Sequence, residues 1–475
     1  MIAPFSARHQ PCLPRKGTPP PGLPTRVLAL AAGTAALLAT SSLAPAQGIP
    51  DYDLPPIEYS SRTPTNRISR LEASFGGTRP TSLTGAPLLR WLLETNRVPV
   101  ESQVLVFSKT SLQRDLIHPR QPRSIYFSDD LYIGWVPGGL MEVTVTDPEL
   151  GMVFYKLEGR DPARPLRFER DAECLSCHGG SMTRNWPGLM VRSVYPDERG
   201  EPITSAGSSL VAHDTPIDDR WGGWYVTGAH GTARHLGNLL AKPSERGAEV
   251  DRDKGANRQR LDDFFPTAPY LRPDSDIVAL MVFEHQVMAH NRLCEASLRV
   301  RKWSHYQRQL QKEMGEPISP VPVGTALRVI NSETERVLEA LLFCEEAALP
   351  AGGIRGAGDF ERGFRANRRP DRQGRSLKDL DFKTRMFAFR CSYMVYSESF
   401  AALPAELKSS VFARLRDVLS AATPPARYAH LPGTERTAIR EILRETLEGY
   451  AAVDPAPTDE KRSAQTSGTT PAPRG

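Results

Sequence analysis

The sequence has little net charge, few cysteines and only one long apolar run. A net charge of +5 spread over 475 residues excludes the electrostatic attraction typical of nucleic-acid-binding proteins. The mean hydropathy of −0.39 and the lack of a second apolar run exclude a multi-span membrane protein. With 40% hydrophobic residues, the chain is long enough for two or three domains with hydrophobic cores of their own.

The one apolar run lies near the N-terminus and has the features of an export signal. It extends from Val27 to Thr40 and follows a segment, 1–26, that contains basic but no acidic residues. This length is typical of a signal peptide and too short to span a membrane. Ala44-Pro45-Ala46 is a small-residue cleavage site, so we expect 1–46 to be a signal peptide and the protein to be periplasmic or secreted. The long basic segment leaves open a later start or an uncleaved anchor.

Only two of the six cysteines are close together in the sequence. Cys12 lies in the predicted signal peptide, and Cys294, Cys344 and Cys391 allow at most one disulfide among them. We interpret these three as small buried apolar side chains. The remaining pair therefore carries the chemical signal of the sequence.

Cys174 and Cys177 form, with His178, the sequence Cys-Leu-Ser-Cys-His. Covalent attachment of a c-type haem requires this spacing. Each thiol adds to a haem vinyl group to give a thioether, and the adjoining imidazole binds the iron as its proximal axial ligand. A random chain of this composition would contain the pattern about 0.002 times. In an oxidising compartment the thioethers would also prevent the thiols from forming a disulfide.

A zinc site is the main alternative to haem. His230 and His235 form a His-x4-His pair that could join Cys174 and Cys177 in a Cys2His2 set. However, the two pairs are separated by far more residues than in a zinc finger, and zinc gives no role to His178. A disulfide or an idle thiol pair is the other alternative, and haem is the interpretation we favour.

The residues Cys174, Cys177 and His178 resemble the haem-attachment signature of c-type cytochromes. An exported chain with one such motif is similar to the uncharacterised bacterial periplasmic single-haem cytochrome-c-domain proteins. The resemblance covers five residues. It implies one covalent haem c, anchored by the two cysteines with His178 as iron ligand, and a redox partner protein.

The sixth iron ligand decides what such a haem does. No Met occurs between Met190 and Met281, and the distal candidates are His230, His235 and His285. A second His would occupy the sixth coordination position of the iron and favour electron transfer. We expect electron transfer in preference to an enzymatic function. An open site would favour small-molecule sensing or peroxidase-like chemistry. A third alternative is a scaffold in which haem or zinc is structural. No residue is assigned a catalytic role.

Apolar periodicity predicts an α+β fold. Alternating apolar residues predict an antiparallel sheet before the haem motif, with strands at 103–107, 124–127, 131–136, 141–146 and 152–157. This sheet-borne motif is more similar to haem-bearing PAS-like periplasmic sensor modules than to small helical cytochromes. The chain then divides into an extended surface segment at 47–80, a haem domain at 81–243, a charged linker at 244–262, a mainly helical domain at 263–451 and a tail without core at 452–475.

Four helices are predicted in the C-terminal part. The first runs from Ile277 to about Leu310 and is capped by Asp274 or Ser275. Ser332 and Glu335 form a capping box that would open the second. The others lie near 404–421 and 434–448, and the Gly- and Arg-rich stretch 352–377 is expected to be a surface loop.

Overall fold

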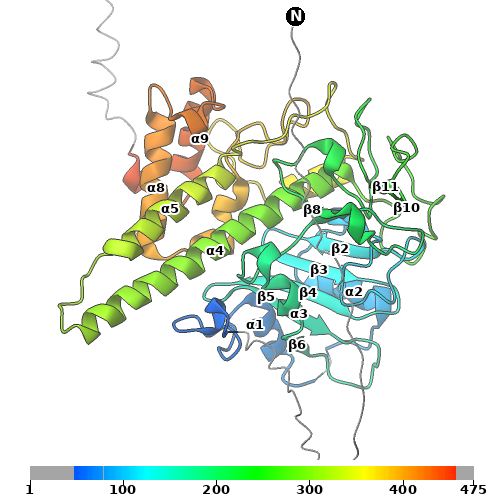
Figure 1. Cartoon of the computed structure of the whole chain (residues 1–475), viewed down its shortest axis with the longest axis horizontal. Coiled ribbons are helices and arrows are strands. Elements are labelled where there is room, and N and C mark those ends of the chain that lie inside the picture. Colours follow the sequence, from blue (N-terminus) through cyan, green and yellow to red (C-terminus); the bar gives the residue numbers. More distant parts are fainter. Residues whose placement is uncertain (1–47, 79, 456–475) are drawn as a thin grey trace, which may run out of the picture. The chain divides into compact units, whose positions relative to one another are not determined.

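A seven-stranded antiparallel sheet forms the framework around which residues 48–78 and 80–455 are arranged in this computed structural model (Figure 1). The strand order is β6-β5-β4-β3-β2-β1-β9. The strands are β1 Val104–Val106, β2 Arg123–Phe127, β3 Leu131–Trp135, β4 Met141–Asp147, β5 Gly151–Leu157, β6 Phe168–Arg170 and β9 Trp224–Tyr225. The five predicted strands are confirmed, and so is the α+β class.

Two short hairpins complete the strands. They pair β7 Arg192–Val194 with β8 Ser208–Leu210, and β10 Lys242–Ser244 with β11 Gly247–Glu249. The second hairpin starts at the boundary of the predicted linker 244–262. Leu261 within that stretch is fully buried, so the stretch is part of the folded unit rather than a solvated linker. The sequence did not predict this burial, because the stretch is rich in charged residues and its few apolar residues are widely spaced.

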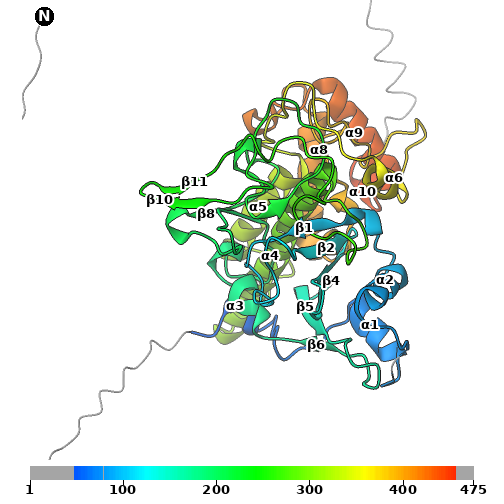
Figure 2. The same ribbon diagram turned by 90° about the vertical axis from the view of Figure 1, so that its right-hand side faces the viewer.

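Alternation of side chains gives the sheet two apolar faces. One face, which includes Ile133 and Val143, packs against α1 Arg67–Ser74 and α2 Gly85–Thr95. The opposite face, which includes Phe154, packs against the long helix α4 Ile277–Glu313. Figure 2 shows α1 and α2 on one side of the sheet, and α3 Cys174–His178 with α4 on the other. The haem motif therefore lies on the α4 side of the sheet.

Helix α4 is the longest element among the described residues. Its 37 residues extend over about 55 Å at 1.5 Å per residue. In the described part of the chain, no helix is apolar over enough of its length to cross a bilayer. The helices that follow are α5 Gly324–Leu341, α6 Asp359–Arg365, α7 Glu398–Ala401, α8 Ala405–Ser420, α9 Gly433–Thr446 and α10 Tyr450–Val453. The predicted helices near 277–310, 404–421 and 434–448 are confirmed.

Three local predictions about helices are wrong. The cap of α4 is Asp276, whose carboxylate accepts from the backbone N–H groups of Val278 and Ala279, because Asp274 is paired with Arg272. Ser332 lies inside α5 rather than at its start, since that helix begins at Gly324, about two turns earlier. The stretch 352–377, expected to be a loop, contains α6.

The N-terminal and C-terminal segments are also more ordered than predicted. Residues 47–80 were expected to be extended, but they contain α1 and the buried side chains of Tyr52 and Tyr59. The Tyr59 hydroxyl donates to the Met152 carbonyl at 2.9 Å, which fixes this segment on the sheet. Asp454, in the predicted tail, is buried and paired with Arg440. The predicted signal peptide and residues 456–475 lie outside the described residues.

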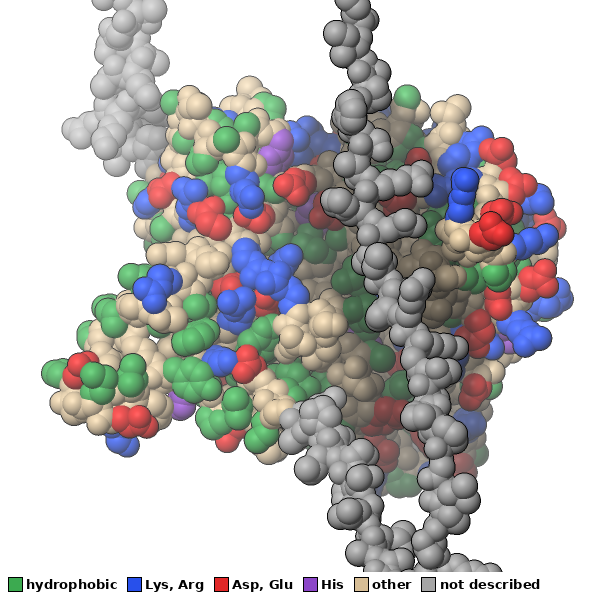
Figure 3. Space-filling model, in the orientation of Figure 1, with side chains coloured by type: hydrophobic (Ala, Val, Ile, Leu, Met, Phe, Trp, Pro, Cys, Tyr) green, Lys and Arg blue, Asp and Glu red, His purple; other side chains and the backbone are tan. Residues whose placement is uncertain are grey.

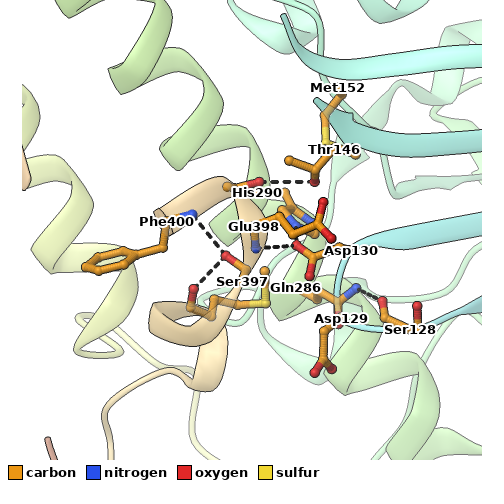
Figure 4. A network of polar contacts seen from close by, with 12 residues as sticks. Ser128, Asp129, Asp130, Thr146, Met152, Gln286, His290, Ser397, Glu398 and Phe400 are labelled. Carbon is orange, nitrogen blue, oxygen red and sulfur yellow. Dashed lines mark hydrogen bonds and ion pairs between the residues drawn. The ribbon is translucent and has the colours of Figure 1, made fainter. Parts of the chain in front are cut away.

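The sheet and the C-terminal helices share one core. The largest apolar cluster combines strand residues with residues of α4, α5, α8 and α9. Figure 4 shows a polar network at this junction, in which the Glu398 N–H donates to Asp130 at 2.9 Å and the Gln286 amide donates to the Ser128 carbonyl at 2.7 Å. Contacts group the described residues from Ile49 onward into one compact unit. The predicted domains 81–243 and 263–451 are therefore joined by a continuous core.

Candidate functional site

The Cys-Leu-Ser-Cys-His motif forms the short helix α3. Cys174 and Cys177 are three residues apart in this helix, so their side chains lie on the same side of it. Both thiols are free; Cys177 is exposed and Cys174 is half-buried. Burial, reinforced by the nearby Asp171, raises the pKa of the Cys174 thiol to about 11. Two free thiols thus lie on one face of a helical turn.

The imidazole of His178 is oriented by a backbone carbonyl. Its Nδ1 lies 2.7 Å from the Gly188 carbonyl oxygen and can only donate to it. Burial lowers the pKa of His178, so the ring is neutral and Nε2 carries the lone pair. The ring also packs on Phe154 of β5, with centroids 4.6 Å apart. Metal-ligating histidines typically have this arrangement, in which the outer nitrogen is held by a carbonyl.

Helix α4 holds the loop that carries this carbonyl. The Asn291 side chain accepts from the Leu189 N–H and donates to the Leu189 carbonyl, both at 2.8 Å. A Cβ atom on Gly188 would lie 2.8 Å from the Asn291 oxygen, so only glycine fits there without a shift. Arg184 of the same loop pairs with Glu295, one turn further along α4, at 2.9 Å. The orientation of His178 therefore depends on α4.

Replacement of Asn291 by alanine tests this dependence. We expect the free energy of unfolding to fall by about 1–3 kcal/mol, because both backbone groups of Leu189 lose their partner. Urea unfolding of N291A measures the loss. The control is Q309A, since Gln309 is exposed on the same helix. Equal stabilities of N291A and Q309A would contradict the role assigned to Asn291.

The sheet beside α3 carries paired charges. Arg123 forms an ion pair with Glu142, and Lys156 forms one with Asp171. The Arg123 guanidinium lies across Gly134, where any side chain would collide with it. The Arg123 Nε is a buried donor without a partner in the described structure. Arg123 and Glu142 both act electrostatically on His178, in opposite directions.

His285, a predicted distal candidate, has no free ring nitrogen. Its Nδ1 lies 2.9 Å from His213 Nδ1, and its Nε2 lies 2.7 Å from the Ser392 hydroxyl. The ring stacks on Phe343 at 4.2 Å and is fully buried. His285 therefore lies in the protein core with both ring nitrogens engaged.

His230 and His235 lie together but away from His178. Their rings are 4.6 Å apart, and both are buried. His235 touches Trp221, whose indole N–H donates to Glu284 of α4. Glu284 precedes Asn291, the contact of the His178 loop, by seven residues, which is about 10 Å along a helix. The structure thus places none of the three distal candidates in contact with His178.

Buried neutral histidines make stability depend on pH. Burial lowers the pKa of His213 to about 4 and that of His235 to about 3, below the ordinary value of 6.5. In acid the unfolded chain therefore binds more protons than the folded one. We expect each of these histidines to lower the free energy of unfolding by about 1.4 kcal/mol per pH unit as the pH falls below 6.5, partly offset by Glu284, whose carboxyl pKa burial raises to about 7. Urea unfolding between pH 7.5 and pH 5 measures this slope, and a flat profile would contradict it.

The zinc alternative requires four residues that the fold does not gather. His178, next to Cys177, is linked through Gly188 and Leu189 to the Asn291 part of α4, whereas His235 lies against Trp221. Within residues 48–78 and 80–455, no group of three or more His, Cys, Asp or Glu side chains is arranged to hold a metal ion. A cavity of about 770 Å³ lies elsewhere, against Phe107, Tyr225 and Phe264, and has no lining residue from α3.

Comparison with known proteins identifies no relative. No protein-family model matches the chain, and neither a curated protein nor a solved structure matches it. Function is therefore inferred from the residues around α3.

Proposed function

We propose that this chain is an exported c-type cytochrome that carries one covalent haem and transfers electrons to or from a redox partner protein. One observation carries the proposal. The motif forms a single helical turn that combines two free thiols with an imidazole whose Nδ1 is held by the Gly188 carbonyl, which leaves Nε2 for iron. A disulfide or an idle thiol pair would not need this orientation of His178.

The described residues fit a haem. Cys174 and Cys177 would anchor it through thioethers, and His178 would bind its iron. The unpartnered Arg123 Nε is a donor near His178 that a haem carboxylate could satisfy. When bound, the haem supplies one-electron exchange at iron. Phe154 and the Asn291-held loop keep the imidazole in one orientation, which limits reorganisation of the site.

A haem-based sensor or a peroxidase-like enzyme is the second candidate. It is favoured by the distance of His230 and His235 from the motif and by the engaged nitrogens of His285. With none of them in place, the sixth position would be open to a small molecule. The Arg123–Glu142 pair, which acts electrostatically on His178, is the cation and carboxylate that such a site would have nearby. A PAS-like haem domain is part of this second candidate.

An optical spectrum separates the two candidates. The protein is expressed with the haem-attachment machinery and measured oxidised, reduced, and reduced with carbon monoxide. A low-spin spectrum that carbon monoxide does not change supports electron transfer with two protein ligands. A high-spin spectrum that shifts with the gas would overturn it in favour of an open site.

A further inference from the structure

An exposed apolar surface lies at the connection between α4 and α5. Leu310, Met314, Ile318 and Val321 are 57%, 61%, 55% and 59% exposed. With the exposed Tyr306, Val323 and Leu327 they form what we call the apolar tip. Figure 3 shows hydrophobic side chains gathered over this end of the two helices. A cluster of exposed apolar side chains is more often an interaction site than an ordinary part of a protein surface.

The apolar tip is a structured surface. Tyr306, Leu310 and Met314 follow one another at every fourth position and share one face of α4. The connection to α5 is fastened to α4 by Gln307, which donates to the Val321 carbonyl at 3.2 Å and accepts from the Val323 N–H at 2.7 Å. The backbone is therefore held in place while the apolar side chains point outward.

The N-terminal segment enters the described structure beside the apolar tip. Asp51 pairs with Lys302, one turn before Tyr306, at 2.6 Å. Ile49, the next large apolar residue toward the N-terminus, is 69% exposed. The apolar run 27–40 lies a short distance upstream in the sequence. An uncleaved anchor at 27–40, which would enter a membrane without spanning it, would therefore bring the apolar tip close to the same membrane.

We propose that the apolar tip docks on the surface of a lipid bilayer. Its side chains would enter the boundary between headgroups and acyl chains, as the apolar faces of interfacial helices do. Arg328, next to Leu327, is exposed and takes part in no ion pair among the described residues, so it can contact lipid phosphates. Arg308 and Lys312 are also exposed, but they lie on the opposite side of α4 from Leu310. Glu313 and Glu316 reduce this charge, so apolar contact is the main attraction. This role does not depend on the haem.

Hydrogen–deuterium exchange of the full chain tests the proposal. The protein is compared with and without vesicles of phosphatidylglycerol and phosphatidylethanolamine. We expect exchange in peptides covering 314–323 to slow by about tenfold or more on adding vesicles, because insertion removes these amides from water. Peptides around Leu240, an exposed leucine elsewhere, are expected to be unchanged.

A triple variant separates the apolar tip from other contacts with lipid. L310S/M314S/I318S is expected to lose the protection at 314–323, and the matched control L240S to retain it. Unchanged exchange of the wild type with vesicles would overturn the proposal. Protection at 314–323 that rises with protein concentration in the absence of vesicles would do so as well, because a second copy would then cover the tip.

Discussion

Replacement of Arg220 by alanine is expected to lower the free energy of unfolding by about 3–5 kcal/mol, because it leaves a buried carboxylate unpaired. Arg220 and Glu284 are 1% and 0% exposed, and their charged groups lie 2.6 Å apart. The same guanidinium donates to the Thr215 and His213 carbonyls, at 2.7 and 3.1 Å. Arg220 therefore fastens the segment after the haem motif to α4.

Urea unfolding of R220A measures this loss. The control is R234A, which removes the exposed ion pair with Asp253 and should change stability by less than about 1 kcal/mol. A loss of similar size in the two variants would mean that the pair with Glu284 is not buried as described.

Replacement of either motif cysteine by alanine is expected to abolish stable haem incorporation and to leave little folded protein. Each thiol supplies one of the two thioethers, so a single variant could hold its haem through only one covalent bond, and the double variant through none. Haem staining after denaturing electrophoresis of C174A and C177A measures covalent attachment. C344A is the matched control, because Cys344 is also a free, half-buried thiol.

The outcome of the double variant is the most informative. If C174A/C177A still gives a stained band of the right size, the cysteines are not the anchors. If C344A loses the stain as well, the loss reflects general misfolding rather than attachment.

Regular elements could be predicted from the sequence because their signals are local. The alternation at 141–146 depends on neighbouring residues, and β4 and β5 form the expected antiparallel pair. The apolar periodicity after Ile277 likewise predicts α4. The buried Tyr52 and Tyr59 could not be predicted, because their burial depends on a sheet that lies far along the chain.

The candidate site was only half predictable. Spacing alone identifies Cys174, Cys177 and His178, since the chemistry acts over five adjacent residues. The turn at Pro187-Gly188 gave a weak signal for the partner of His178, and Asn291 gave none, because it is 102 residues from Leu189. His213, which engages His285, was missed for the same reason. Periodicity places a histidine on an inward face without saying which groups it meets there.

The mass of the intact protein tests the central claim most directly. The chain is expressed together with the haem-attachment machinery and denatured, and its intact mass is measured by mass spectrometry. We predict a single species that is heavier by one haem, with the added mass retained after denaturation because two thioethers hold it. An unmodified mass, with Cys174 and Cys177 joined in a disulfide or bound to zinc before denaturation, would contradict the assignment of a c-type haem.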